Sequence, residues 1–109
     1  MELTETGLIE IELQGVEGEK IAIIDDDHQI ELIVKALSSK TRRNILRYIR
    51  GGPKDVSNIA KTLSMTEANI SAQIKKLEEA NLISCDYSSG LHGVRKISKL
   101  KTSQLTLSF

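Results

Sequence analysis

Short polar side chains and lysines recur along one side of the segment 66–79, opposite an apolar stripe. Ile70, Ile74 and Leu77 mark that stripe at helical spacing, so the polar side of the helix is expected to face away from the core. Amide and hydroxyl groups can hydrogen-bond to the edges of DNA bases, alanine can touch thymine methyl groups, and lysine can contact phosphate or guanine. The candidate DNA-binding residues of this helix are Thr66, Ala68, Asn69, Ser71, Ala72, Gln73, Lys75 and Lys76.

Two short helices joined by a tight turn are predicted for the segment 55–83. In the first helix, over residues 56–63, apolar residues recur at spacings of three, one and three, and Asp55 stands at the N-cap position. Residues 64–66 form the turn, Thr66 caps the second helix, and Asn81 suits a left-handed C-terminal cap. This is the layout of a helix-turn-helix, which places its second helix in the major groove of DNA.

A β-hairpin is predicted directly after the second helix. Residues 82–87 have the pattern of a strand, residues 88–93 that of a loop, and Val94 begins a basic returning strand. Val94, Ile97 and Leu100 are spaced by three, which fits a regular strand poorly and predicts a bulge or a turn near Ile97. Such a hairpin would be the wing of a winged helix. Its candidate DNA contacts are His92, Arg95 and Lys96.

Two amphipathic helices are predicted before the helix-turn-helix. Three consecutive acids, residues 25–27, would cap the first helix, and Ser38 or Ser39 would cap the second, in which Ile45 and Ile49 face inward. Basic residues lie on the opposite side of the second helix. They could contact DNA phosphates or simply form an ordinary solvent-exposed helix face. The possible phosphate contacts are Lys40, Arg43 and Arg47, with Arg50 on the same side and Arg42 nearer the buried edge.

Strands are also predicted at both ends of the chain. Apolar and polar residues alternate over residues 9–14, a turn follows at 15–19, and residues 20–24 form a second, more apolar strand. Alternation returns over residues 104–109. A lone terminal strand exposes its edge, so we expect it to pair with the N-terminal hairpin, either within one chain or across a dimer. The helices do not obviously cover the apolar faces of these strands.

The formal net charge of zero hides a separation along the chain. Residues 1–30 hold nine acids and one base, a net charge of −8, whereas residues 31–109 hold fourteen bases and six acids, a net charge of +8. The helical part is therefore basic enough to meet a polyanion such as DNA. The N-terminal arm would be repelled by one, or would fold onto its own basic body.

No catalytic or metal-binding constellation is expected. Acids followed by His28 invite a metal hypothesis, but helix capping already accounts for them. Cys85 is the only cysteine, so it cannot form a disulfide within the chain. We expect it to be a small apolar residue of a strand, and not to bind a metal together with His92. No nucleophile, base and orienting group can be assembled, and no phosphate-binding glycine loop is present. The sequence predicts a protein that is not an enzyme and has no cofactor.

A chain of 109 residues is long enough for one core but not for two. We expect a single α+β domain over residues 1–109, a winged helix-turn-helix with an N-terminal β-hairpin and a C-terminal strand. Its parts are an acidic hairpin arm (1–27), a winged-helix body (28–101) and the final strand (102–109). No apolar run reaches membrane-spanning length and no signal-peptide pattern precedes the fold, so no membrane partner is expected and the cytoplasm is the expected compartment.

The order and spacing of these segments resemble one family of regulators. The residues 36–46, the helix-turn-helix and the residues 77–83 together are similar to the arsenic-repressor (ArsR) class of winged helix-turn-helix transcription regulators, over roughly residues 30–100. The resemblance implies a dimer on a palindromic operator, with the second motif helix in the major groove and the wing beside it. Metal-sensing members use paired cysteines on the first motif helix or ligands at the dimer interface. Residues 56–63 contain none of these cysteines.

The sequence thus predicts a sequence-specific, double-stranded DNA-binding transcriptional regulator, a homodimeric repressor that uses a recognition helix and a wing. The alternative is a winged helix that acts as a protein-interaction adaptor in a larger assembly. No small-molecule effector and no operator sequence are identifiable from the residues. The acidic arm departs from the simplest members of the family, which dimerise through helices at the two ends, so the dimer geometry is left open.

Overall fold

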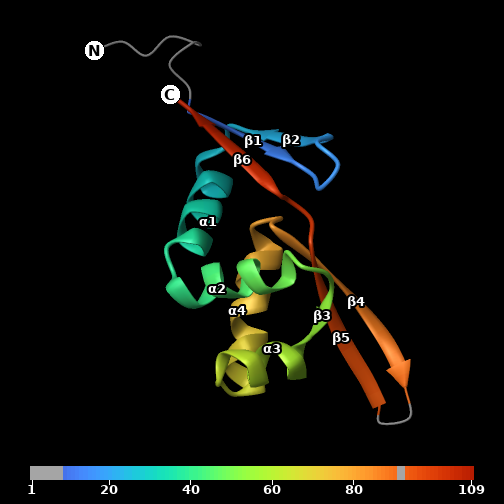
Figure 1. The fold of residues 1–109 in the computed structure, drawn as a ribbon. Helices are drawn as coiled ribbons and strands as arrows, with labels where there is room; N and C mark the ends of the chain where they lie inside the picture. Colours follow the sequence, from blue (N-terminus) through green and yellow to red (C-terminus); the bar gives the residue numbers. More distant parts are fainter. Residues whose placement is uncertain (1–8, 91–92) are drawn as a thin grey trace.

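The computed structural model describes residues 9–90 and 93–109, and in these it has an α+β fold of four helices and two three-stranded sheets (Figure 1). The elements are β1 (Glu10–Gln14), β2 (Lys20–Ile24), α1 (Asp27–Leu37), α2 (Lys40–Ile49), β3 (Lys54–Asp55), α3 (Val56–Leu63), α4 (Glu67–Glu79), β4 (Ile83–Gly90), β5 (Gly93–Leu100) and β6 (Gln104–Ser108). The predicted winged helix-turn-helix with a hairpin before it and a strand after it is confirmed. Below, β1, β2 and β6 are the terminal sheet, and α1 to β5 are the winged-helix body.

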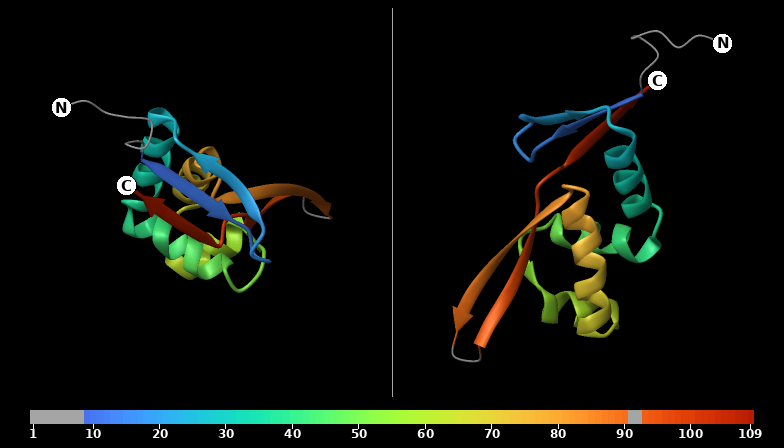
Figure 2. Two further views of the ribbon diagram at one scale, coloured as in Figure 1. Left: turned by 90° about the horizontal axis from the view of Figure 1, so that it is seen from above. Right: turned by 180° about the vertical axis from the view of Figure 1, so that it is seen from behind.

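Strands from the two ends of the chain pair in the terminal sheet, whose strand order is β2-β1-β6. On β1, Leu13 lies opposite Ala22 of β2 and Leu105 of β6, in antiparallel register. Ile11 and Leu13 are 1% and 0% exposed, so this face is part of the main core. The sheet lies over the helices when the molecule is seen from above (Figure 2, left). The C-terminal strand thus pairs within one chain, and the expectation that the helices leave these strand faces uncovered is wrong for Ile11 and Leu13.

Side-chain caps set the starts of α1 and α2. Asp26 accepts a hydrogen bond from the Gln29 backbone N–H at 3.0 Å, as expected for one of the three acids. Ser39, the second of the two candidate serines, accepts one from the Arg42 backbone N–H at 3.3 Å. Each helix then buries one apolar stripe in the shared core, where a fully buried aliphatic side chain contributes roughly 1.5–3 kcal/mol. The buried aliphatic residues of α1 and α2 are Ile33, Ala36, Ile45 and Ile49.

The helix-turn-helix forms where the pattern predicted it. Asp55 caps α3 by accepting from the Asn58 backbone N–H at 2.7 Å, and Thr66 caps α4 by accepting from the Asn69 backbone N–H at 3.1 Å. Between the helices, Ser64 takes a left-handed conformation with φ of 56°. Asn81 has φ of 61° after α4, which confirms the expected left-handed cap.

The wing is the hairpin of β4 and β5, and the short β3 pairs with the other edge of β5. The register of β4 against β5 runs without a shift from Ile83 opposite Leu100 to Gly90 opposite Gly93. The predicted bulge or turn near Ile97 is therefore wrong. At Ile97, β5 is paired with β3 on one edge and with β4 on the other, which keeps the strand regular. Its one buried side chain is the polar Ser98, so the apolar residues of β5 do not mark its buried face. The candidate contact His92 lies outside the described residues.

Candidate nucleic-acid interface

The outer face of α4 consists of exposed residues with short side chains near its start. Ala68, Ser71 and Ala72 are exposed in the first half of the helix, and Lys75 follows one turn later. On the opposite side, Ile70 and Ile74 are 0% exposed and anchor the helix in the core. A helix whose outer side chains are short can approach base edges in a major groove closely. Seen from behind, α4 lies at the front of the molecule with the wing beside it (Figure 2, right).

A hydrogen-bonded chain fixes the flank of α4 that faces α1 and α2. Arg42 donates through Nη1 to Oε1 of Gln73 at 2.7 Å, and Nε2 of Gln73 donates to Oδ1 of Asn69 at 3.0 Å. The same guanidinium donates to the backbone oxygens of Lys35 and Ala36, both at 2.8 Å, in the last turn of α1. Asn69 and Gln73 are half-buried, so their amides are held in one orientation beside the exposed face.

The role of Arg42 could not be read from the sequence, which placed it near the buried edge without assigning it a partner. Its side chain is only 9% exposed, and it joins the end of α1 to the flank of α4. The signal was an arginine at a core-facing position, three residues before Ile45 on the same helix. A guanidinium at such a position needs acceptors, and the carbonyls at a helix C-terminus supply them.

Ion pairs fix the other flank of α4, which faces the wing. Lys96 of β5 donates to Oε1 of Glu78 on α4 at 2.8 Å, and Arg95 pairs with Asp55 at the start of α3. Partial burial lowers the pKa of Lys96, but the hydrogen bond to Glu78 and the nearby charges of Cys85, Glu78 and Tyr87 together more than offset this, so that the pKa is raised overall. Arg95 and Lys96, the two predicted wing contacts among the described residues, thus have carboxylate partners that hold the wing against the helices. Their contact with DNA stays a prediction.

A hollow of about 240 Å³ separates the first residues of β5 in the wing from the start of α4. Across it, Ser57 of α3 donates to Oε1 of Glu67 at 2.5 Å, and the exposed Val94 lies on the wing side. Ser71 of α4 lines the same hollow. The exposed face of α4 and this hollow are therefore continuous, as a groove-reading helix and a neighbouring wing require.

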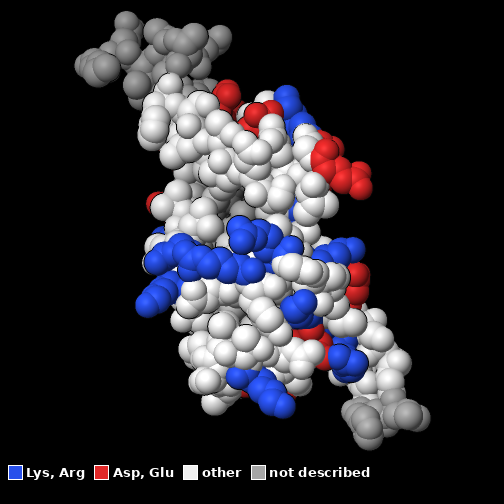
Figure 3. Space-filling model, viewed as in Figure 1, with Lys and Arg blue, Asp and Glu red and all other residues white. Residues whose placement is uncertain are grey.

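The predicted phosphate contacts on α2 lie on another side of the molecule. Figure 3 shows a band of basic side chains across the front view, in which α2 lies in front of α4 (Figure 1). Lys40, Arg47 and Arg50 are exposed, whereas Arg43 is half-buried and donates to the backbone oxygen of Leu37 at 2.8 Å. A straight duplex that lies along the outer face of α4 is not expected to reach this band as well.

Asp26 and Cys85, two further residues with metal-binding or reactive side chains, have structural partners. Asp26 caps α1, and within residues 9–90 and 93–109 no three histidine, cysteine or acidic side chains come together as a metal site would need. The Sγ of Cys85 lies 3.3 Å from Oγ of Ser98 on the neighbouring strand. Burial raises the pKa of the Cys85 thiol, and the hydrogen bond to Ser98 offsets part of that rise. In the part of the chain that the structure describes, none of the helices is both long and apolar enough to cross a bilayer.

Comparison with known proteins gives one family match and several similar structures. The family model of bacterial regulatory proteins of the arsR family matches residues 39–84, from the cap of α2 into β4. The crystal structure of an ArsR family transcriptional regulator is 30% identical, with a TM-score of 0.57 over 67% of this chain and 76% of that chain. A search of curated proteins found no match.

Two further similar structures come from Mycobacterium bovis. A crystal structure of a possible transcriptional regulatory protein is 25% identical, with a TM-score of 0.60 over 67% of this chain and 74% of that chain. A solution structure of a homodimeric winged helix-turn-helix DNA-binding domain, from a possible ArsR-family regulator, is 23% identical. Its TM-score is 0.60 over 67% of this chain and 64% of that chain, a likeness that concerns the fold alone.

Proposed function

The chain belongs to the arsR family of bacterial regulatory proteins, and from this premise we propose that it is a homodimeric repressor of transcription that binds a specific sequence of double-stranded DNA. The outer face of α4 reads base edges in the major groove, and the wing lies along the neighbouring backbone. Repression needs no further contact, because a dimer bound across a promoter excludes other proteins from it. The protein acts in the cytoplasm, where it meets chromosomal DNA.

The observation that carries the proposal is the way α4 is braced. Arg42 and Gln73 hold one flank, and Glu78 and Lys96 hold the other. The residues between the two flanks have no such internal role: Ala68, Ala72 and Lys75 point outward. A helix fixed on both sides with a short-chained outer face is preorganised to enter a groove, so little ordering is needed on binding.

The terminal sheet is our candidate for the dimer interface. Leu107 and Phe109 are 42% and 90% exposed, and Ile9, which lies opposite Phe109 if the register continues, is 43% exposed. β6 is also an edge strand of its sheet, which a second copy could extend. Two-fold pairing there would hold two recognition helices at the spacing of about 34 Å that successive major grooves require. The Mycobacterium bovis domain with the same fold is described as homodimeric.

The competing role for the acidic arm is to shield the basic body of its own chain. Among the described residues, the ion pair of β2, between Lys20 and Glu12, stays inside the terminal sheet, and the other three join residues of the winged-helix body. None of these four pairs joins an acid of the sheet to a base of the body. Figure 3 likewise leaves the basic band uncovered by acidic side chains. The charges therefore favour an interface over a shield.

The test is the salt dependence of binding to duplex DNA, measured by fluorescence anisotropy. If about six phosphates are neutralised, log K against log salt should fall with a slope of roughly −5. Lys75→Gln should reduce the steepness of that slope by about 1, whereas Lys61→Gln, at the far end of α3, should leave it unchanged. A flat dependence, or no binding at low salt, would contradict the proposal and favour the protein-interaction adaptor.

A further inference from the structure

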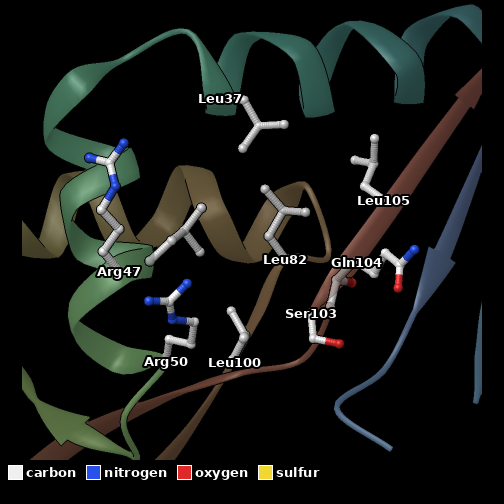
Figure 4. A pocket seen from close by; sticks show the side chains of 10 residues that line it. Leu37, Arg47, Arg50, Leu82, Leu100, Ser103, Gln104 and Leu105 are labelled. Atoms are coloured by element: carbon white, nitrogen blue, oxygen red, sulfur yellow. The ribbon is translucent and has the colours of Figure 1, made fainter. Parts of the chain in front are cut away.

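A cavity of about 210 Å³ lies where the terminal sheet meets the winged-helix body. α2 forms one side of it and β6, with the chain leading into β6, forms the other (Figure 4). The deep part is apolar, because leucines from α1, α2, β5, β6 and the start of the wing converge there. These are Leu37, Leu46, Leu82, Leu100 and Leu105. None of the candidate residues on the outer face of α4 lines the cavity, so it is distinct from the nucleic-acid interface.

Two arginines line the α2 side of this apolar cavity. Arg47 and Arg50 follow one another on one face of α2 and are exposed, and no ion pair joins either to an acid among the described residues. In Figure 4 both side chains extend from α2 along one rim of the cavity, across from Leu105. Arg47 makes one hydrogen bond, from Nη1 to the Asn44 side chain at 2.8 Å. Each guanidinium presents five N–H groups, so most of their donors are left for solvent or a ligand.

Two of the polar side chains on the β6 side of the cavity are already hydrogen-bonded, and the amide of Gln104 lies beside them. Oγ1 of Thr102 donates to the backbone oxygen of Asn81 at 2.8 Å, and Oγ of Ser103 donates to the backbone oxygen of Gly15 at 2.7 Å. The chemistry of the site is thus a leucine-lined hollow with positive charge along one rim. Such a site favours a ligand that has an apolar body and one negatively charged end.

We propose that this cavity binds a small amphipathic carboxylic acid, and that its occupancy changes the affinity of the protein for DNA. A cavity of about 150 Å³ lined by aliphatic side chains accommodates benzene, so the observed volume suits a straight-chain acid of about six carbons or an aromatic acid of similar size. The carboxylate pairs with Arg50 and Arg47, since guanidinium groups match carboxylate geometry. The apolar body packs against the leucines.

The position of the cavity explains how occupancy reaches the DNA-binding surface. The chain between β5 and β6 is bonded on both sides: Thr102 N–H donates to the Leu82 oxygen at 3.1 Å, and Ser103 N–H donates to the Gln14 oxygen at 2.9 Å. A ligand there contacts α2 of the winged-helix body together with Gln104 and Leu105 at the start of β6 in the terminal sheet. If the sheet makes the dimer, a small rotation at this joint alters the spacing of the two recognition helices. This second part rests on the proposed function, whereas the binding site itself does not.

The binding site is tested on the full chain without DNA, by following leucine methyl signals in NMR titrations. Hexanoate is the probe, with 1-hexanol and hexylamine as neutral and cationic controls of matched length. We expect saturable shifts centred on the methyls of Leu46, Leu82 and Leu105, and an affinity for hexanoate about tenfold or more above that for hexanol. Equal affinity for the acid and the alcohol, shifts centred elsewhere, or no saturation would overturn the site.

Two variants and a matched control test whether the arginine charge and the apolar cavity each contribute to binding. Arg50→Gln removes an exposed charge at the rim. It should weaken the binding of hexanoate about tenfold and leave the affinity for hexanol unchanged. Leu100→Phe should fill the cavity and weaken the binding of both hexanoate and hexanol, with folding checked by circular dichroism. Lys61→Gln removes an equal charge elsewhere and should change neither. If Arg50→Gln binds hexanoate as tightly as the unaltered chain does, the carboxylate assignment is wrong.

The regulatory part is tested by repeating DNA anisotropy with saturating hexanoate. We expect the dissociation constant to change at least threefold, and Arg50→Gln to abolish the change while keeping DNA affinity without ligand. An unchanged constant in a protein that binds both hexanoate and DNA would overturn the regulatory part. If DNA binding is absent altogether, the proposed function and its regulation fail together while the methyl shifts still decide the binding site.

Discussion

The winged-helix body and the terminal sheet differ in charge and in whether the arsR family model covers them. The family model covers residues 39–84 and so lies wholly inside the body, whereas all three strands of the terminal sheet lie outside it. The body holds the basic residues, and residues 9–24 hold four acids and one base. Recognition of a polyanion therefore belongs to one region, and the other is free to serve assembly.

The two regions nevertheless share one core. Ile11 and Leu13 of the sheet are as buried as Ile45 or Ile74 of the body. The sheet is thus a structural part of the domain and not a detachable arm, and deletion of residues 1–24 would uncover that core. Point substitutions at its buried and at its exposed apolar positions separate its contribution to folding from its contribution to assembly.

The largest expected effect is on the inner face of the sheet. Leu13→Ala should lower the free energy of unfolding by about 3 kcal/mol, because it removes a fully buried side chain and leaves a cavity. Ile23→Ala, at a position that is 50% exposed in the same sheet, should cost less than about 1 kcal/mol. Urea denaturation measures both. Equal costs would mean that the sheet does not share the core of the body.

The next effect concerns the exposed apolar end of the sheet, where Leu107 of β6 lies opposite the buried Ile11 and Phe109 follows at the end of the chain. Leu107→Lys combined with Phe109→Lys should weaken dimerisation about a hundredfold, since both side chains are exposed in one chain and become buried in the dimer we propose. Sedimentation velocity measures the change. Val16→Lys, at an exposed apolar residue of the β1–β2 turn, is the matched control and should leave the dimer intact. If the doubly substituted protein is still a dimer, the interface does not include Leu107 and Phe109 and must lie elsewhere.

Within the body, two polar residues of α4 should respond differently from each other. Asn69→Ala should cost on the order of 1–3 kcal/mol at a preferred DNA site and relax selectivity there, if its amide contacts a base. Lys76→Gln should weaken all sequences more evenly, as a phosphate contact does. Competition anisotropy with a preferred and a scrambled duplex separates the two. If neither substitution alters the affinity of the folded protein, the recognition surface has been misplaced.

The smallest effect is the reactivity of Cys85 at the base of the wing. Because burial raises the pKa of its thiol, iodoacetamide at pH 8 should alkylate it several-fold more slowly than a free cysteine. Ser98→Ala removes the hydrogen bond that partly offsets the rise, and should slow the reaction further. A raised pKa in the folded state also means that this group's contribution to stability is lost as the pH rises through that pKa. Alkylation as fast as that of free cysteine would contradict the assignment.

The sequence predicted those parts of the fold whose signals are local. Caps at Asp55 and Thr66, the left-handed Asn81 and the helical stripes all follow from short-range geometry, and all were confirmed. The bulge near Ile97 was wrong because pairing on both edges of β5 overrides the apolar spacing. That β6 would pair with β1 in its own chain depends on contacts between distant residues, which no local pattern fixes.

The candidate site divides in the same way. The outward direction of Ala68, Ala72 and Lys75 follows from the helical period, and the structure places them as expected. The internal roles of Arg42 and Gln73, 31 residues apart, could not be predicted, since they arise where α1, α2 and α4 meet. For the same reason, no pattern in the sequence indicated that Arg47 and Arg50 border a cavity shared with β6.

The most direct test of the account is an NMR titration of the full-length protein with its preferred duplex, following backbone amide signals. We predict that the largest shifts fall on residues 66–76 of α4 and on the wing, with little change in β1 and β2. The basic band of α2 is the alternative surface. Largest shifts at Lys40, Arg43 and Arg47, with α4 unaffected, would contradict the claim that α4 of the winged-helix body reads the DNA.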